Sequence, residues 1–470
     1  MPRKHNKCHT SCSEEEDKAT KCCRRLGALI KAFQPTPICS LPFTITESGT
    51  YVVIKDLVHA GAEGGITITA NDVVLDLNSH SITIIQDGAN GIFVNGASNV
   101  FIKNGSINFA GNPTVTTAGA GIRVENANNV EIEHVAVRGT FIGIQIISSN
   151  SVHLHEVHLE ENIQNNVSAR AGSGLVIHDT FARNTLFPGG LLGGGFFFAG
   201  VGIEPETGIR DVDLQNIETI GSDFFFQEAF NVTADKIKIA FNDPDYIFSM
   251  FQLGVSDIDA PSFVRNAILK DSNFYSTNAN ASAKGVQINS GNGIIIDGIT
   301  VNIDSQGTGL PTEEAGIKLV IGAEVNSAAG NFVDTVVVRN SVFTSPIERP
   351  SGHGVSIFAN DGFLNRAVTL ENNTITNQLG DGVIVNNSRG TVLKNNTISN
   401  SAGNGIRLLD NADESVLLKN IVQENGVGLN IASDRNTVVK NIVVNNVGAG
   451  LINTGLLNNF VDNLFFNNGA

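Results

Sequence analysis

A short motif, a glycine followed by alternating apolar residues, recurs along most of the chain and constrains its fold more than any other feature. The last four steps between copies are 28, 23, 23 and 22 residues. The copies begin at Gly91, Gly121, Gly143, Gly174, Gly285, Gly316, Gly354, Gly382, Gly405, Gly428 and Gly450. A period of about 20 to 50 residues is the signature of a solenoid, whose repeats pack only on their neighbours. The 470 residues therefore need not divide into several domains.

Each repeat holds three short apolar segments with period-two alternation, which predicts strands whose side chains point alternately inward and outward. The second segment commonly ends in Asn, as at Asn395 and Asn420, and a third follows, as in Thr397-Ile-Ser. Asn tolerates left-handed backbone at a corner. Equivalent Asn side chains, stacked at about 4.8 Å, are expected to bond one another in a ladder. The pattern predicts an all-β solenoid of about 12–15 coils.

Two segments near the start of the repeats carry a family resemblance. Phe43-Thr-Ile-Thr-Glu-Ser-Gly-Thr-Tyr-Val and Val74-Leu-Asp-Leu-Asn-Ser-His-Ser-Ile resemble the first coils of pectin-lyase-like right-handed parallel β-helix proteins. The resemblance covers residues 40–470 and implies a right-handed solenoid. That fold hosts polysaccharide lyases, hydrolases and epimerases, viral spikes and adhesins, so the fold does not choose a function.

Residues 1–39 form a separate, charged segment that contains every cysteine of the chain. These are Cys8, Cys12, Cys22, Cys23 and Cys39. Apolar residues at helical spacing predict a helix between about Ala19 and Phe33, which we expect to cap the open first coil. Attachment to a partner or surface is the alternative. The adjacent pair Cys22 and Cys23 does not suit a standard zinc site, so unpaired thiols are expected. Disulfides or intermolecular cross-links are one alternative, and zinc binding together with His5 and His9 is another. No cofactor is expected.

Residues 185–280 interrupt the repeat with irregular insertions rich in Gly and Phe. Three consecutive rings occur at Phe196 to Phe198 and again at Phe224 to Phe226. Three neighbouring side chains of a strand cannot all face the core, so some of these rings must lie outside. Either insert loops bury them, or they form a surface for self-association into a homo-oligomer.

Composition excludes several classes of partner. The formal net charge is −16 at pH 7, and so acidic a chain would be repelled by nucleic acid. No run of 18 apolar residues is present, so no membrane span is expected. The first 25 residues lack the apolar core of a classical secretory signal. A virion or other surface location remains the expectation.

The outward positions of two successive coils bring acids and imidazoles together. Glu131 and Glu133 point outward from one coil, and the next coil should place His153 over Glu131 and His155 over Glu133. Such pairs could serve as general acid and base, or bind a metal. The alternative is a solvated outer face without chemistry. His178 is expected on the neighbouring first strand, two coils beyond the outward residue Arg123.

A second candidate is His353, in the segment Gly352-His-Gly. This segment is similar to the Gly-His-Gly of polygalacturonases, and the resemblance implies a catalytic histidine. The family's Asn-Thr-Asp, Asp-Asp and Arg-Ile-Lys segments are absent. Inverting hydrolysis needs two carboxylates about 6.5–9.5 Å apart, and no such pair is evident. A coil-corner residue is the alternative for His353.

Two functions follow. The first is a non-enzymatic structural or surface protein, such as a virion, spore or cell-envelope component, with binding capacity on the side of the rod. The second is a polysaccharide-binding or polysaccharide-degrading protein, similar to a lyase or hydrolase, that uses Glu131, Glu133, His153 and His155. The chain has no Trp and three Tyr, the rings that most often stack on sugars, which favours the first function.

Overall fold

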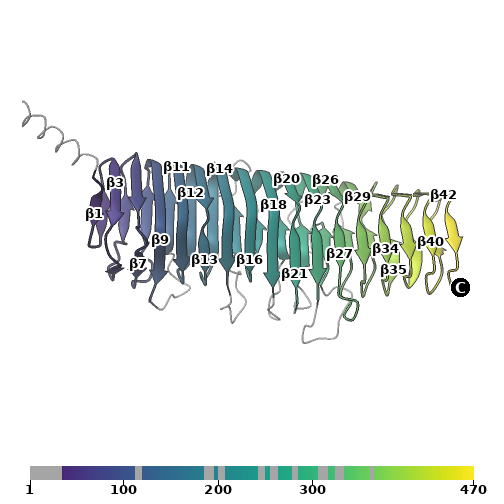
Figure 1. The fold of residues 1–470 in the computed structure, drawn as a ribbon. Coiled ribbons are helices and arrows are strands. Elements are labelled where there is room, and N and C mark those ends of the chain that lie inside the picture. Colours follow the sequence, from purple (N-terminus) through teal and green to yellow (C-terminus); the bar gives the residue numbers. More distant parts are fainter. Residues whose placement is uncertain are drawn as a thin grey trace, which may run out of the picture.

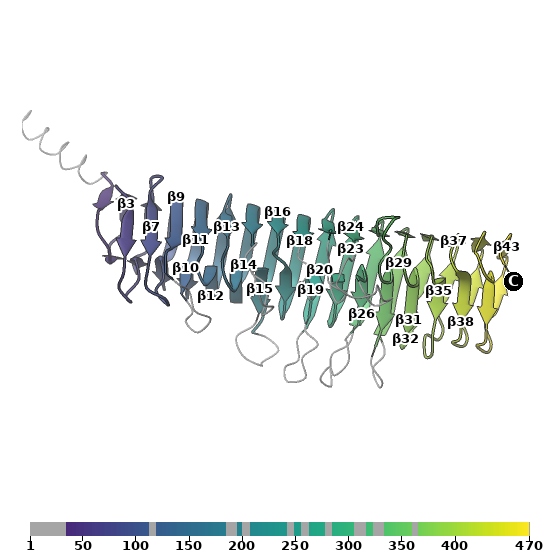
Figure 2. The ribbon, with the colours of Figure 1, turned by 90° about the horizontal axis from the view of Figure 1, so that it is seen from below.

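The computed structural model describes residues 34–111, 119–184, 195–199, 207–241, 249–254, 263–277, 284–304, 316–322, 333–359 and 365–469. These residues form one rod, a right-handed parallel β-helix in which each coil lies directly against the next (Figure 1). Every strand pair among them is parallel, because the chain returns to the same side of the rod once per coil. The view from below shows the same regular succession of coils from the N-terminal to the C-terminal end (Figure 2).

The strands form three stacks, one on each side of the coil. Six long strands bend through a corner and contribute to more than one stack: β9 (Ser98–Phe109), β11 (Asn128–Arg138), β12 (Ile142–His155), β14 (Asn165–Arg183), β16 (Ile209–Ile220) and β18 (Ala229–Phe241). The first stack contains parts of β12 and β14 with β2 (Phe43–Ile45), β5 (Ile66–Ile68), β8 (Ile92–Asn95), β10 (Ala120–Glu125), β15 (Gly195–Ala199), β17 (Phe224–Phe226), β19 (Ser249–Leu253), β22 (Lys284–Ile288), β25 (Leu319–Ile321), β28 (Val355–Phe358), β31 (Val383–Asn386), β35 (Asn404–Leu408), β38 (Val427–Ile431) and β41 (Leu451–Asn453).

The second stack contains parts of all six long strands with β1 (Thr36–Ile38), β3 (Gly49–Val53), β6 (Val73–Asp76), β20 (Val264–Lys270), β23 (Gly291–Asp297), β26 (Val333–Arg339), β29 (Asn365–Glu371), β32 (Ser388–Arg389), β33 (Val392–Lys394), β36 (Val416–Leu418), β39 (Thr437–Val439) and β42 (Asn459–Val461). The third contains parts of β9, β11, β14, β16 and β18 with β4 (Leu57–His59), β7 (Ser81–Ile84), β13 (His158–Glu160), β21 (Asn273–Ser276), β24 (Thr300–Ile303), β27 (Val342–Thr344), β30 (Thr374–Thr376), β34 (Thr397–Ser399), β37 (Ile421–Gln423), β40 (Ile442–Val444) and β43 (Leu464–Phe466).

Inward side chains of successive coils stack on one another and make one continuous core. Ile122, Ile144 and Val167 occupy the same position on three consecutive coils, and each is 0% exposed. The motif glycine is needed where its coil turns into the first stack. At Gly382 an added Cβ would lie 2.3 Å from Ile398 Cγ2 and 2.6 Å from the carbonyl oxygen of Gly405. Only glycine allows this close approach.

The predicted asparagine ladder is confirmed in the last coils. Each side-chain amide donates to the Oδ1 atom of the next Asn, at 2.9–3.0 Å. The ladder runs through Asn373, Asn396, Asn420, Asn441 and Asn463. The preceding residue takes the left-handed corner conformation, with φ of 55° at Asn395. Asn395 itself is therefore exposed and belongs to the outer corner, not to the buried ladder.

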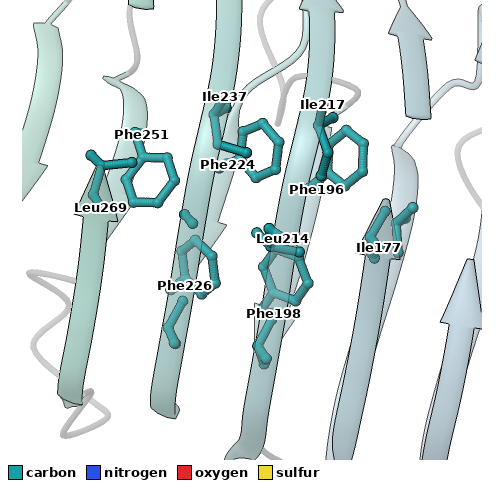
Figure 3. Close-up of a cluster of buried hydrophobic side chains, with 14 of the residues drawn as sticks. Ile177, Phe196, Phe198, Leu214, Ile217, Phe224, Phe226, Ile237, Phe251 and Leu269 are labelled. Carbon is teal, nitrogen blue, oxygen red and sulfur yellow. The ribbon is translucent and has the colours of Figure 1, made fainter. Parts of the chain in front are cut away.

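Paired phenylalanines continue the core through the region that interrupts the sequence repeat (Figure 3). Phe196 stacks on Phe224, and Phe198 on Phe226, with ring centroids 4.5 Å apart in both pairs. These four rings are 0% exposed. The middle ring of each triplet points outward, as the alternation requires. The described strands of this region therefore extend the stacks, and most of the rings expected at a self-association surface lie inside.

The first stack passes through sixteen levels in the described residues, slightly more than the twelve to fifteen coils expected. The coils of β17 and β19 begin without the motif glycine, and in β15 Gly195 is followed by three phenylalanines without alternation, so the sequence pattern does not count these coils. The predicted helix between Ala19 and Phe33 and the first four cysteines lie outside the described residues. Cys39 is exposed and forms no disulfide there. No helix in the described ranges is long and apolar enough to cross a membrane.

Candidate functional site

The predicted acid–base cluster lies on the outward side of the second stack, where β11 and β12 run side by side. The strand register places Glu131 beside His153 and Glu133 beside His155, as the alternation predicts. Glu131 and His153 are exposed. Neither forms a hydrogen bond or an ion pair within the part of the chain that the structure describes. The backbone therefore brings the predicted residues together, while their side chains do not pair as expected.

The neighbouring imidazoles pair instead with carboxylates at the corner after the second stack. His134 Nδ1 lies 2.9 Å from Glu133 Oε1, and its Nε2 pairs with Glu156. His155 Nε2 lies 3.2 Å from Asp179 Oδ2. These side chains are substantially exposed, so each pair adds at most about 1 kcal/mol of stability. Among the described residues, no group of three His, Cys, Asp or Glu could hold a metal ion.

The Asp179 carboxylate at this corner is stabilised in its ionised form by its neighbours. Its Oδ1 accepts a hydrogen bond of 2.5 Å from the side-chain amide of Asn216. That bond, with a smaller contribution from His155, lowers the pKa of Asp179 below its usual range. Asp179 is therefore ionised near neutral pH and suits an electrostatic role better than that of a proton donor.

The placement expected for His178 is wrong. His178 belongs to the second stack, where its register partner on the previous coil is His155. Gly174 does not begin a coil: it lies at the corner with a φ of 71°, and the first-stack strand of this coil starts earlier, near Asn165. His153, His155 and His178 therefore share the second stack, away from Arg123 in the first stack, while His158 belongs to the third.

His353 is separate from this cluster, at the entrance to the first stack in a later coil. It is 2% exposed, and its Nδ1 accepts a hydrogen bond of 2.8 Å from the backbone N–H of Asp381 on the next coil. The Asp381 carboxylate lies 4.0 Å from that nitrogen and 3.7 Å from an Arg407 guanidinium nitrogen. An accepting Nδ1 is unprotonated, so the neutral ring carries its proton on Nε2. This contact joins two coils, in keeping with a corner residue.

An open hollow with a volume of about 480 Å³ lies at the corner between the first and second stacks. It is lined by Ser148, Asn150, Ala171, Gly172, Ser173, Thr207, Gly208 and Arg210. The residues come from three successive coils, because the register places Asn150 beside Ser173 and Ser173 beside Arg210. Asn150 Oδ1 accepts hydrogen bonds from the backbone N–H and the hydroxyl of Ser173, at 3.0 and 3.2 Å. Sequence reasoning missed this site, because Ser, Asn, Thr and Gly are also ordinary turn residues.

Arg210 is held at one side of the hollow by an aromatic ring. Its guanidinium lies over the Phe230 ring, 5.3 Å from the centroid, and Arg265 of the following coil lies 5.7 Å from that centroid. Both distances suit cation–π attraction, which orients a guanidinium over the face of a ring.

Glu228 lies behind the hollow and is 7% exposed. Burial raises the pKa of its carboxyl, although the N–H of Gly208 and the charges of Arg210 and Arg265 act in the opposite direction. Glu228 does not belong to the lining of the hollow. Its nearness to the two arginines indicates a supporting role for their positions.

Comparison with protein families agrees with this architecture. A family model described as "Right handed beta helix region" matches residues 322–466. The fold and this match identify the chain as a right-handed parallel β-helix protein. The comparison with curated protein sequences found no match.

Several solved structures resemble the chain at low sequence identity. A catalytic domain of a GH87 alpha-1,3-glucanase, in complex with tetrasaccharides, is 11% identical with a TM-score of 0.45, over 80% of this chain and 66% of that one. The endo-xylogalacturonan hydrolase from Aspergillus tubingensis is 9% identical with a TM-score of 0.39, over 74% and 87%. A tailspike protein of E. coli bacteriophage HK620, in complex with a pentasaccharide, is 11% identical with a TM-score of 0.41, over 91% and 72%. The chain spans about two thirds or less of the glucanase domains: it covers 66% of one of them and 60% of another.

Proposed function

We propose that the protein is a non-enzymatic surface β-helix that binds a polysaccharide in the corner hollow. The observation that carries this proposal is the lining of the hollow, which combines hydroxyl, amide and guanidinium groups and contains no carboxylate. A rod that binds a glycan on its side suits a component of a virion, spore or cell envelope.

The size and chemistry of the hollow suit sugar units. Small-molecule sites are commonly about 300–1,000 Å³, and the hollow has about 480 Å³. The hydroxyls of Ser148, Ser173 and Thr207 can each donate and accept hydrogen bonds, as sugar hydroxyls do. The Asn150 amide adds donors, since its Nδ2 makes no hydrogen bond within the described ranges, and Arg210 adds a positive charge at one side of the hollow.

The position of the hollow suits a polymer. It is open to solvent and extends across three coils along the side of the rod. A polysaccharide chain could therefore lie along the corner and continue past the hollow in both directions, which a closed pocket would not allow.

The test is a panel of neutral and acidic polysaccharides, read for binding by calorimetry and for new reducing ends or unsaturated products. We expect binding without turnover. Asn150→Ala and Arg210→Ala should each weaken binding about 10-fold or more, because each removes donors worth roughly 1.4 kcal/mol or more. Thr369→Ala, on the outward side of the second stack in a distant coil, is the control and should bind normally. A folded protein that binds none of the panel, or variants that bind normally, would contradict the proposal.

A catalytic role for Glu131, Glu133, His153 and His155 is the second candidate. The observation in its favour is their nearness to the hollow: Asn150 and His153 lie on the same strand, β12, three residues apart. At about 3.3 Å per residue this separates their backbones by roughly 10 Å. Turnover that disappears in Glu131→Ala and His153→Ala, with binding retained, would establish this function. Turnover that survives both substitutions would place the chemistry elsewhere.

A further inference from the structure

A ladder of alternating charge runs along the outward side of the second stack, through the six coils from β18 to β33. In chain order its members are Asp235, Lys270, Asp297, Arg339, Glu371 and Lys394. Each member is the register partner of the next, so acids and bases alternate at the coil spacing of about 4.8 Å. The strands β20, β23, β26 and β29, which carry the four central members, follow one another along the rod (Figure 1).

Within one chain the ladder is joined as three ion pairs. Their N–O distances are 3.3, 2.8 and 2.5 Å, in the order Asp235–Lys270, Asp297–Arg339 and Glu371–Lys394. Asp235 is mostly buried, but the other five side chains are 28–46% exposed. Partly exposed ion pairs of this kind add little to the stability of a single chain. Their exposed sides can face a second molecule.

A column of uncharged, β-branched residues lies beside the ladder, two residues earlier on each strand. Its members are Thr233, Ile268, Ile295, Val337, Thr369 and Val392. Ile268 is 38% exposed, and the other five are partly exposed. Short side chains at one position of every coil make an even surface, which another sheet can approach to about 10 Å. Such a row of partly exposed apolar residues suits a contact with another molecule.

We propose that this face, the ladder together with the uncharged column, binds the same face of a second copy, with the two rods antiparallel. A two-fold axis between β23 and β26, perpendicular to the rods, sets ladder against ladder and column against column. An alternating ladder with an even number of members has the opposite charge at every place when it is read from its other end. The facing pairs are then Asp235 with Lys394, Lys270 with Glu371, and Asp297 with Arg339, and each pair forms twice.

The same pattern disfavours the other ways of joining two such faces. If the rods ran parallel, face-to-face contact would set the charged ladder of each copy against the uncharged column of the other. Charges would then lose water without gaining a partner, which is unfavourable. If antiparallel rods slipped by one coil, acids would face acids and bases would face bases. The ladder therefore specifies both the direction and the register of the contact.

The chemistry of the face favours a second copy over other partners. A nucleic acid or an anionic membrane presents one sign of charge, so neither can match a ladder that alternates at every coil. The three acids and three bases sum to zero, although the whole chain carries −16, so the two faces do not repel each other. Six coils make a strip about 29 Å long and about 15 Å wide, which would bury roughly 900 Å² from the two copies together. That area suits a weak dimer that dissociates on dilution.

The first test measures the mass and the length of the full chain in solution. Over a dilution series, multi-angle light scattering should pass from twice the chain mass of 49.7 kDa toward one chain. The maximum dimension in small-angle X-ray scattering should stay well short of two rod lengths, because the rods overlap side by side. A monomer at every concentration, or a dimer two rods long, would overturn the proposal.

The second test exchanges the charges of one facing pair. Lys270→Glu sets two acids against each other in both copies of the contact, and Glu371→Lys sets two bases against each other. Each variant alone should dimerise at least 10-fold more weakly than the parent. An equimolar mixture should regain dimers of the parent's affinity: the introduced glutamate of one variant meets the introduced lysine of the other, and the second contact keeps its natural Lys270 and Glu371. An indirect effect on the fold would not be repaired by mixing.

Lys238→Glu is the matched control. It makes the same change of charge as Lys270→Glu, but Lys238 lies on the third stack with its side chain 61% exposed, so the dimer should be unchanged. Ile268→Asp gives a second reading of the face: at a partly exposed position it places a charge in the uncharged column and should also weaken the dimer at least 10-fold. Circular dichroism confirms that each variant is folded. Dimers that persist in Lys270→Glu and Ile268→Asp, or a mixture that stays monomeric, would contradict the proposed contact.

Discussion

The side-chain amide of Asn396 donates a hydrogen bond to Asn420 Oδ1 on the next coil, at 3.0 Å, in the interior of the rod. The backbone N–H of Asn396 donates to the same oxygen, also at 3.0 Å. The Asn420 amide in turn donates to the carbonyl oxygen of Leu393 and to Asn441 Oδ1. One Asn thus satisfies polar groups from three coils, which would otherwise be buried without partners.

Replacement of Asn420 by Ala should lower the free energy of unfolding by about 2–4 kcal/mol, since it leaves the Asn396 N–H and the Leu393 carbonyl unpaired. Hydrogen exchange at the Asn396 amide should accelerate. Gln423→Ala removes an amide that faces outward from the same coil, so it should change stability by less than about 0.5 kcal/mol. Equal effects of the two substitutions would argue against the ladder.

Neighbouring phenylalanines should differ in their contribution to stability. Phe226 is 0% exposed and stacks on Phe198, while Phe225 points outward. Phe226→Ala should cost about 3–5 kcal/mol, because it leaves a cavity in the core. Phe225→Ala should cost about 1 kcal/mol, the value of its stacked contact with Phe197. Urea denaturation of the two variants checks this, and a larger loss for Phe225→Ala would contradict the strand's orientation.

Lys318 should make stability depend on pH in the alkaline range. It is fully buried, its Nζ donates to Ser351, and burial lowers its pKa well below 10.5. The unfolded chain therefore holds a proton on Lys318 that the folded chain lacks. This difference destabilises the fold below the pKa of Lys in the unfolded chain, about 10.4, and the destabilisation decreases as the pH rises toward that value. Lys318→Met should be more stable than the parent at pH 7, and the difference should shrink toward pH 10. A difference that is constant with pH in thermal melts would show that Lys318 does not titrate in this way.

The motif glycine at Gly382 should not tolerate a side chain. An alanine Cβ would meet both Ile398 and the backbone carbonyl of Gly405, and overpacking of this kind should cost about 3 kcal/mol. Gly96 has a φ of 68° and no atom within 4 Å of an added Cβ, so Gly96→Ala should cost only about 1 kcal/mol of backbone strain. The melting temperatures of the two variants compare the effects. A smaller fall in melting temperature for Gly382→Ala than for Gly96→Ala would mean that adjacent coils can move apart.

The repeat made the architecture predictable, because period-two alternation and corner residues act locally and recur in every coil. Alternation also predicted the register of Glu131 with His153, since equivalent positions of a solenoid lie one coil apart. The same reasoning misplaced His178, because Gly174 resembles a coil start although it lies at a corner. It also missed the coils of β15, β17 and β19, whose first strands are rich in Phe and lack a glycine followed by alternating apolar residues.

The sequence by itself thus determined the parallel solenoid, the alternation of inward and outward side chains and the asparagine ladder. Only the tertiary structure decided which side chains pair across coils, such as His155 with Asp179, because rotamers and corner geometry depend on the neighbouring coils. It also decided where the surface is hollow. The lining residues Asn150, Ser173 and Arg210 are separated by 23 and 37 residues in the chain, and the winding of the rod brings them together.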